Sequence, residues 1–445
     1  LRKKFGGIQE MYNIVSKLLI YGDMDEDSIL MQLSDIFRCM DEGSQTKDVL
    51  RTRVFKQVKR ILEVATDYAF DKNLWHNYLT YLLITNENPF SITCEKVGAS
   101  EGSVNHFAKS DFKAFKELFD FDFNRIEDEL GVDCFSRISD YKAIGKPELM
   151  YNKNVSEKVQ ALSERLETAK DENEFFDMVT DFYKAYGVGM FGLNKAFRIE
   201  ECGDNNIRFR AINNMDKVVL SDLVGYEIQK QKLVENTEAF VEGRKANNVL
   251  LFGDSGTGKS TSIKAIVNEY YDQGLRMIEI YKHQFKDLSN VIAQIKNRNY
   301  RFIIYMDDLS FEEFEIEYKF LKAVIEGGVE TKPDNILIYA TSNRRHLVRE
   351  KFSDKEERRD DLHSSDTVQE KLSLVARFGV SIFFCAPDKK QFQNIVKTLA
   401  ERHQVEMPEE ELLLEANKWE LQHGGLSGRT AQQFIDYLCG KNENE

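Results

Sequence analysis

The segment of residues 253–260 reads GDSGTGKS, in which three glycines are followed by a lysine and a hydroxyl. It fits the pattern G-x-x-x-x-G-K-[ST] and lies between the apolar run VLLF and a helical spacing of Ile263, Ile266 and Tyr270. Glycines let the main chain aim its N–H groups inward, and a helix N-terminus adds about half a positive charge. The pattern therefore predicts a phosphate cradle, and a random chain of this length would match it only about 0.02 times.

The side chains of this cradle have separate expected roles. Lys259 would reach the outer phosphates of the bound group, and Ser260 would hold Mg²⁺. The expected nucleotide-binding residues of the loop are Gly253, Asp254, Ser255, Gly256, Thr257, Gly258, Lys259, Ser260 and Thr261.

A second apolar run, RFIIYM, ends in two acids, Asp307 and Asp308. A strand that ends in an acid near a phosphate-binding loop supplies the carboxylate on the metal side. We expect Asp307 to hold Mg²⁺ through water and Asp308 to polarise the attacking water. Glu312 or Glu313 could share this base role, or both could simply begin a solvated helix.

Three further polar residues follow in an order that extends the same site. The buried strand NILIYATSN ends in Asn343, whose amide could hold the attacking water near the γ-phosphate. Arg377 lies in EKLSLVARFGV, and Arg429 opens a helix in GGLSGRTAQQF. A lone arginine is more often a surface charge. Their order behind a phosphate cradle and an acid-ended strand favours a role at the phosphates.

The elements that must position these residues change along the chain. Residues 1–195 read as mainly α-helical, and residues 196–215 as a hairpin and linker. Residues 216–386 alternate buried strands with helices, which predicts an α/β domain with a parallel sheet. Residues 387–445 turn helical again and would form a small lid.

Aromatic stripes recur in the helical N-terminal part. The stretch SDFKAFKELFDFDF gives Phe112, Phe115 and Phe119 a helical spacing behind a candidate N-cap at Ser110. Such stripes are usually the core of a helical domain, although they could also line a groove for a partner.

The composition is typical of a soluble globular protein, with 445 residues and a net charge of -14. The acidic balance argues against a broad nucleic-acid footprint, without excluding a small basic patch. The cysteines form no C-x-x-C pair, and no apolar run reaches the roughly 18 residues of a membrane span. These features favour a cytoplasmic protein with reduced thiols. The chain begins with Leu1, so its native start could be missing or processed.

Taken in order, these motifs resemble those of the AAA+ ATPases, and more closely those of a bacterial AAA+ family of unassigned function. The resemblance is carried by NNVLLFGDSGTGKS, DDLSFEE, YATSNRRHL, EKLSLVARFG and GLSGRTAQQF, which span about residues 220–438. It implies that Asn343 is the sensor-one residue, Arg377 the arginine finger and Arg429 the sensor-two residue. By the same resemblance, Tyr226 in DLVGYE would lie against the adenine.

Two positions depart from the family pattern. Asp308 stands where most AAA+ proteins have glutamate, which could slow hydrolysis or require another base. Ala376 precedes Arg377 where close relatives would have an acid. The resemblance also implies that the arginine finger acts across a subunit boundary, so the chain would assemble with itself as a ring or an open spiral.

Two functional hypotheses follow. In the first, the protein hydrolyses ATP in an oligomer to remodel or regulate a protein client. In the second, it is a nucleotide-switched binding module, such as a helicase loader that acts on protein–DNA complexes. The charge-dense segment 349–371 and the cluster Arg344, Arg345 and Arg349 could contact a partner, or could be solvated surface. A P-loop kinase or GTPase is disfavoured, because no N-K-x-D base-reading motif is present.

Overall fold

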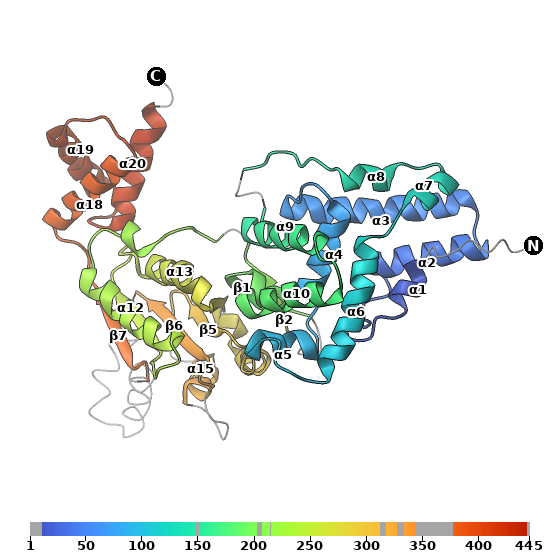
Figure 1. Ribbon diagram of the computed structural model, residues 1–445. Coiled ribbons are helices and arrows are strands. Elements are labelled where there is room, and N and C mark those ends of the chain that lie inside the picture. Colours follow the sequence, from blue (N-terminus) through green and yellow to red (C-terminus); the bar gives the residue numbers. More distant parts are fainter. Residues whose placement is uncertain are drawn as a thin grey trace, which may run out of the picture. The chain divides into compact units, whose positions relative to one another are not determined.

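The computed structural model describes residues 11–147, 151–202, 207–213, 215–311, 317–326, 333–343 and 377–442. The chain forms two compact units, Leu1–Asn194 and Lys195–Glu445 (Figure 1). The first unit is helical, and the second combines a mostly parallel sheet with a C-terminal group of helices. The expected fold class, an α/β domain with a helical lid that follows a mainly helical N-terminal part, is confirmed.

The first unit packs α-helices around one hydrophobic core. In chain order they are α1 (Met11–Val15), α2 (Ile29–Glu42), α3 (Lys47–Tyr68), α4 (Leu74–Thr85), α5 (Pro89–Val97), α6 (Val104–Phe119), α7 (Asn124–Leu130), α8 (Cys134–Ser139), α9 (Lys153–Glu167), α10 (Glu172–Tyr186) and α11 (Gly189–Leu193).

Polar caps and glycines determine where these helices begin and end. The hydroxyl of Ser28 accepts the N–H of Met31 at the start of α2, and Gly43 ends that helix with a left-handed φ of 62°. Asp171 caps α10 in the same way, and Gly187 ends it with a φ of 81°. Local sequence therefore accounts for both helices.

The aromatic stripe of α6 belongs to the core. Its buried members are Phe112, Phe115, Leu118 and Phe119. The helix begins at Val104, so the predicted N-cap Ser110 lies inside it and this prediction is wrong. The neighbouring Asp111 is buried, and its carboxylate accepts the N–H groups of residues 19–21. This acid caps a distant segment of the chain instead of marking a helix start.

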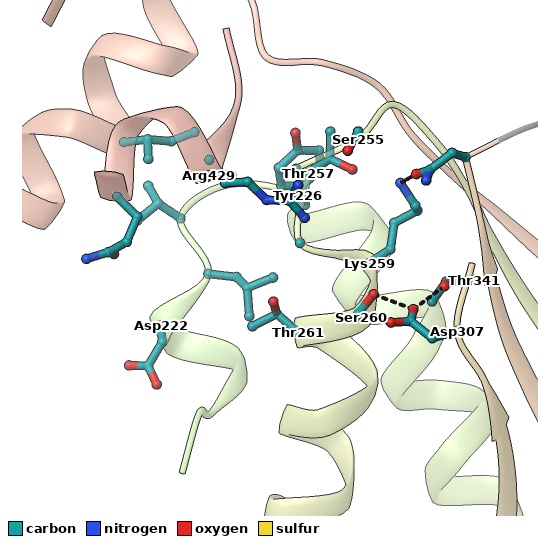
Figure 2. A pocket seen from close by; sticks show the side chains of 18 of the residues that line it. Asp222, Tyr226, Ser255, Thr257, Lys259, Ser260, Thr261, Asp307, Thr341 and Arg429 are labelled. Atoms are coloured by element: carbon teal, nitrogen blue, oxygen red, sulfur yellow. Dashed lines mark hydrogen bonds between the residues drawn. The ribbon is translucent and has the colours of Figure 1, made fainter. Parts of the chain in front are cut away.

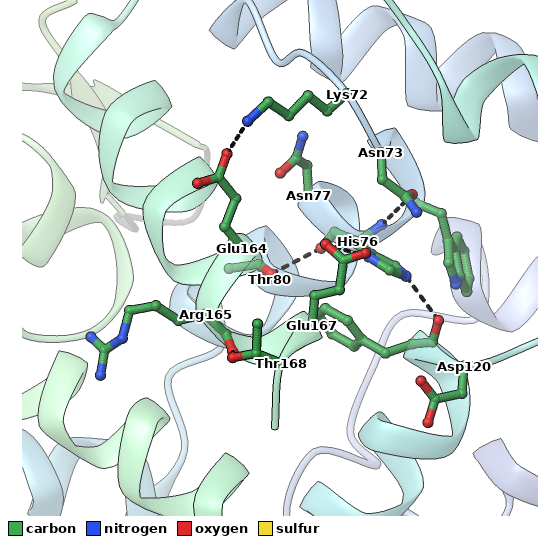
Figure 3. A network of polar contacts seen from close by, with 12 residues as sticks. Lys72, Asn73, His76, Asn77, Thr80, Asp120, Glu164, Arg165, Glu167 and Thr168 are labelled. Atoms are coloured by element: carbon green, nitrogen blue, oxygen red, sulfur yellow. Dashed lines mark hydrogen bonds and ion pairs between the residues drawn. The ribbon is translucent and has the colours of Figure 1, made fainter. Parts of the chain in front are cut away.

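A polar network surrounds His76 on α4 (Figure 3). Its Nε2 lies 2.8 Å from the carbonyl oxygen of Phe119, and its Nδ1 lies 4.0 Å from a carboxylate oxygen of Glu167. Burial lowers the pKa of His76, although the Phe119 carbonyl and the Glu167 charge oppose this shift. A neutral ring that donates Nε2–H to Phe119 fits these contacts.

The variant His76→Gln is expected to blunt the loss of local stability in acid. The folded pKa of His76 lies below its ordinary value of 6.5, so below about pH 6.5 the unfolded state binds more protons and the free energy of unfolding falls. Glutamine retains a donor for Phe119 but does not titrate. Amide hydrogen exchange in α4, corrected for intrinsic rates, should therefore accelerate in mild acid more strongly in the wild type. Equal acceleration in both proteins would contradict this prediction.

Within its described residues, the second unit has a seven-stranded sheet of order β2-β1-β4-β5-β6-β3-β7. The strands are β1 (Ala196–Glu201), β2 (Ile207–Ala211), β3 (Val249–Gly253), β4 (Leu275–Glu279), β5 (Arg301–Met306), β6 (Ile336–Ser342) and β7 (Val380–Phe384). β1 and β2 are antiparallel, and the other neighbouring pairs are parallel. β1 pairs with β4, so the expected hairpin extends this sheet, and the unit boundary lies before it at Asn194.

Helices of the second unit surround the sheet and form the lid. The sheet is accompanied by α12 (Glu227–Val241), α13 (Lys259–Tyr270), α14 (Leu288–Ile295), α15 (Glu317–Glu326) and the short 3-10 helix η2 (Leu220–Asp222). The lid consists of α18 (Lys389–Arg402), α19 (Glu409–Gln422) and α20 (Gly428–Asn442), which share a separate hydrophobic core. Among the described residues, no helix combines the length and apolar character needed to cross a membrane.

The parallel register brings three predicted site segments to one edge of the sheet. Phe252 of β3 pairs with Ser342 of β6, and Met306 of β5 pairs with Ala340 of β6. The residues that follow each strand therefore emerge side by side. These are the loop after β3, the acids after β5 and Asn343 after β6.

Candidate nucleotide-binding site

A cavity of about 630 Å³ opens at this carboxyl edge of the sheet (Figure 2). It is lined by the segment before α12, the loop between β3 and α13, the ends of β5 and β6, and the lid helices α18 and α20. Seven of the nine loop residues predicted from the sequence line it, namely Ser255, Gly256, Thr257, Gly258, Lys259, Ser260 and Thr261.

Two glycines give the loop its shape. Gly256 and Gly258 have left-handed φ values of 73° and 89°. A Cβ atom on Gly258 would lie 2.6 Å from Cδ2 of Leu223, and one on Gly256 would lie 2.9 Å from Oγ of Ser427. Larger residues are therefore disfavoured by both conformation and space. Because α13 begins at Lys259, its first N–H groups add partial positive charge beside the loop.

The first two residues of the motif do not line the cavity. A Cβ on Gly253 would lie 2.0 Å from the carbonyl oxygen of Phe384. The N–H of Asp254 donates to that same carbonyl at 3.0 Å, and its carboxylate accepts the N–H of Ala386 at 2.7 Å. These two residues attach the loop to the end of β7.

Lys259 is almost buried beneath the loop, with 6% of its surface exposed. Its Nζ donates to the carbonyl oxygens of Gly253 and Asp254 at 3.0 and 2.5 Å, and to Oδ1 of Asn343 at 3.0 Å. Burial lowers the pKa of Lys259, whereas the charges of Asp254 and Asp308 oppose this shift. The arrangement holds one cation between the loop and Asn343.

Asp307 is the carboxylate on the expected metal side. Its Oδ1 accepts the hydroxyl of Ser260 at 2.7 Å and the hydroxyl of Thr341 at 2.6 Å, as Figure 2 shows. Burial opposes ionisation of Asp307, but hydrogen bonds from Thr341 and Ser260 outweigh it, so the pKa of this carboxyl is lowered. Asp307 is therefore an anion at neutral pH.

Asp308 points its carboxylate at Asn343. The side-chain amide of Asn343 donates to Oδ1 of Asp308 at 2.8 Å, while its oxygen accepts from Lys259. Asp308 has a left-handed φ of 47°, which aspartate tolerates better than most residues. One amide thus links the two residues expected to contact the outer phosphate and the attacking water.

The residues of this end of the cavity fit both a phosphate chain and Mg²⁺. At Gly256 and Gly258 the lack of a side chain lets neighbouring groups approach the main chain closely, and the Ser260–Asp307 pair offers the oxygen ligands that Mg²⁺ prefers. In the described part of the chain, no group of three or more His, Cys, Asp or Glu side chains could hold a metal ion. A Mg²⁺ ion here would share its coordination with phosphate oxygens and water, as this ion usually does.

Part of the cavity is an apolar slot. It is lined by Leu223 and Val224 from the segment before α12 and by Ile395 and Leu399 from α18. Tyr226 also lines the cavity; its hydroxyl donates to the carbonyl of Cys385 at 2.8 Å. A planar base suits such a slot. Of these residues the sequence analysis predicted only Tyr226, although Ile395 and Leu399, four residues apart, share one face of a helix.

Long side chains hold the apolar wall in place. Arg402, at the end of α18, donates to the carbonyl oxygens of Ser221 and Asp222, both at 2.7 Å. The nearly buried Lys230 donates to the carbonyl of Leu223 at 2.8 Å. Both cations bind main-chain oxygens of one short segment, so they fix its position between α12 and the lid.

Arg429 reaches the cavity from the lid. It is the second residue of α20, and it lines the cavity together with Gln432. The N–H of Arg429 donates to the carbonyl of Gly256 at 3.2 Å, so the start of α20 contacts the phosphate loop directly. The structure thus brings Tyr226, Lys259 and Arg429 to one cavity.

Arg377 does not line this cavity. It lies three residues before β7, whose first residue, Val380, pairs with Val249 at the start of β3. The loop follows the other end of β3, so the five-residue strand separates them by roughly 17 Å. Several other predicted positions lie outside the described residues, namely Glu312, Glu313, Arg344, Arg345, Arg349, Ala376 and the segment 349–371.

The glycine-rich loop follows β3, and the two acids follow β5, which is separated from β3 by β6. Together with the helical lid, this arrangement defines a P-loop protein of the AAA+ type. The family profile described as "Protein of unknown function (DUF815)" matches residues 193–442, which is more than half of the chain. The chain therefore belongs to this family, and the resemblance expected from the sequence is confirmed.

Individual proteins and solved structures match over short segments or at low sequence identity. The replication factor C large subunit of Methanococcus vannielii is 43% identical over 51 residues, which are 12% of this chain and 10% of that protein. The chain therefore spans about a tenth of that curated relative. Among solved structures, the FIGL-1 AAA domain in complex with ADP has a TM-score of 0.35 at 17% identity, covering 51% of this chain and 75% of that one. The Thermotoga maritima RuvB Holliday junction branch migration motor has a TM-score of 0.31 at 15% identity, covering 49% and 71%.

Proposed function

We propose that this protein binds ATP with Mg²⁺ and hydrolyses it in a homo-oligomer to remodel or regulate a protein client. The observation that carries the proposal is the hydrogen-bonded chain Lys259–Asn343–Asp308 beside the Ser260–Asp307 pair. It gathers a cation, a metal-side carboxylate and a candidate base at one end of a cavity with an apolar slot.

Each of these groups has a distinct proposed role. Lys259 and Arg429 would neutralise phosphate charge, and Ser260 and Asp307 would hold Mg²⁺. When bound, Mg²⁺ neutralises charge that develops on the phosphate oxygens. The adenine of ATP would occupy the slot formed by Leu223, Val224, Ile395 and Leu399.

Asp308 and Asn343 would orient the attacking water. The water oxygen would form a bond to the γ-phosphorus while the bond to the bridging oxygen breaks, and Asp308 would accept the proton. Asp308 has a carboxylate at the cavity, and the Asn343 amide limits its orientation. Such positioning is the main contribution that proteins make to phosphoryl transfer.

The position of Arg377 supports assembly of several chains. Arg377 precedes the amino end of β7, whereas the proposed phosphate loop follows the carboxyl end of β3. Because β3 and β7 are parallel, Arg377 and the loop of the same chain lie at opposite ends of these strands. If Arg377 contacts a nucleotide, that nucleotide would belong to another copy of the chain. A homo-oligomeric ring or spiral would supply such a neighbour.

A second candidate is a nucleotide-switched binding module with little turnover, such as a helicase loader. The observation that favours it is the short Asp308 side chain, which is already engaged by Asn343. Strongly salt-dependent binding of single-stranded DNA, together with negligible turnover, would favour this alternative. The net charge of -14 weighs against it.

The variant Asp308→Asn tests the proposed function most directly. Asparagine keeps the size of the side chain but accepts a proton poorly, so ATP turnover should fall by about 10²- to 10⁴-fold. Affinity for ATP should stay within about threefold, because Asp308 is not proposed to hold phosphate or base. Calorimetry and phosphate release measure the two quantities separately.

The matched control is Asp272→Asn, an equivalent change at an exposed residue outside the cavity. It should leave both quantities unchanged. Unaltered turnover in Asp308→Asn would remove Asp308 from the mechanism. If the variant binds ATP and stalls, it should also retain the protein client in a pull-down.

A further inference from the structure

Thr341 lies where the two acids leave β5. It is on β6, the strand beside β5, and only 2% of its surface is exposed. Its hydroxyl donates to Oδ1 of Asp307 at 2.6 Å and accepts the N–H of Asp308 at 2.9 Å. Its carbonyl accepts the N–H of Leu309 at 2.7 Å. One buried residue therefore contacts three consecutive residues of the site.

The hydrogen bonds of the Thr341 hydroxyl have a defined direction. The N–H of Asp308 can only donate, so it occupies a lone pair of the hydroxyl oxygen. The single hydroxyl proton then points to Asp307, where it stabilises the charged carboxylate. The hydroxyl thus fixes the orientation of the Asp307 carboxylate relative to the Asp308 main chain.

Thr341 also supports the left-handed turn at Asp308. A non-glycine residue with a φ of 47° is disfavoured in isolation, so its surroundings must hold it in place. The N–H groups on both sides of this turn, at Asp308 and Leu309, bind Thr341. This turn directs the Asp308 carboxylate toward Asn343.

We propose that Thr341 is a positioning residue, whose hydroxyl holds Asp307 for the metal and the Asp308 turn for the attacking water. This inference rests on the proposed function, and assigns a role to a residue that neither the motifs nor the family match identifies. Thr341 does not itself contact phosphate or water in this account; it acts through the two acids.

The test compares Thr341→Val with Thr341→Ser. Valine keeps the shape and removes the hydroxyl, whereas serine keeps the hydroxyl. The matched control is Thr237→Val on α12. The buried hydroxyl of Thr237 lies 2.8 Å from the hydroxyl of Tyr339, which is on β6, the strand that carries Thr341. A loss of buried hydroxyls in general would affect both valine variants alike.

The readout is the affinity for ATPγS measured by calorimetry with and without Mg²⁺, together with ATP turnover. In Thr341→Val the gain in affinity from Mg²⁺ should shrink by about tenfold or more, and turnover should fall by a similar factor. Metal-free affinity should stay within about threefold, which also shows that the variant is folded. Thr341→Ser and Thr237→Val should resemble the wild type.

An unchanged Mg²⁺ dependence in Thr341→Val overturns the inference, as does an equal loss in Thr341→Ser or Thr237→Val. If Thr341→Val does not fold, Thr341→Ala provides the same comparison with serine. A wild type that shows the Mg²⁺ gain without turnover would refute the hydrolysis proposal alone. A wild type without any Mg²⁺ gain would refute both.

Discussion

Replacing Lys259 with methionine is expected to weaken ATP binding by about 100-fold or more. Methionine fills nearly the same space but carries no charge. The lysine is nearly buried. Without its charge, only the N-terminus of α13 and the loop amides would face the multiply charged triphosphate. In such a setting one charge-assisted contact contributes more than it does in water.

The loss of affinity in Lys259→Met is compared with the same change at a lysine outside the cavity. Lys259 also donates to the carbonyls of Gly253 and Asp254, so its removal could loosen the loop. The control is Lys264→Met on the same helix, because Lys264 pairs with Asp216 outside the cavity. Calorimetric affinity for ATP should be unchanged in the control. A Lys259→Met protein that binds ATP as tightly as the wild type would exclude the proposed phosphate site.

Replacing Arg377 with alanine is expected to lower ATP turnover by about 10³-fold, the lower range for an arginine finger. The affinity of the single chain for ATP should change little, since Arg377 lies at the opposite edge of the sheet from its own cavity. Arg301→Ala is a suitable control, because Arg301 also begins a strand at that edge. Turnover per chain should rise with protein concentration in the wild type and in this control.

Mixing two inactive variants separates action within one chain from action between chains. A chain with Arg377→Ala keeps its phosphate site, and a chain with Lys259→Met keeps its arginine. If the arginine acts on a neighbour, mixed assemblies should regain part of the turnover that neither variant shows alone. The absence of any recovery, in mixtures shown to assemble, would contradict action between chains.

The sequence predicted those parts of the site that lie close together along the chain. The spacing of Gly253 to Ser260 suffices to predict the loop, because the proposed phosphate contacts come from consecutive residues. Asp307 and Asn343 were predicted because each directly follows an apolar strand. The alternation of strands and helices likewise predicted the α/β sheet and the helical lid.

The remaining features depend on contacts between distant segments. The role of Thr341 follows only from the strand order, which places β6 beside β5. The slot joins Leu223 to Ile395, which a local pattern does not connect. Asp254 belongs to the loop motif, yet its carboxylate holds the end of β7. The motif therefore predicts a phosphate-binding loop without showing what each of its side chains contacts.

The hydrogen bond from the Arg429 N–H to the Gly256 carbonyl makes the C-terminal helices part of the proposed phosphate cradle. Ser427 lies close enough to Gly256 that a methyl group would not fit between them. A truncated chain that stops after β7 would therefore lose one wall of the base slot and the support behind the loop. The smallest fragment able to retain a nucleotide should extend through α20, even though the recognisable motif ends at Ser260.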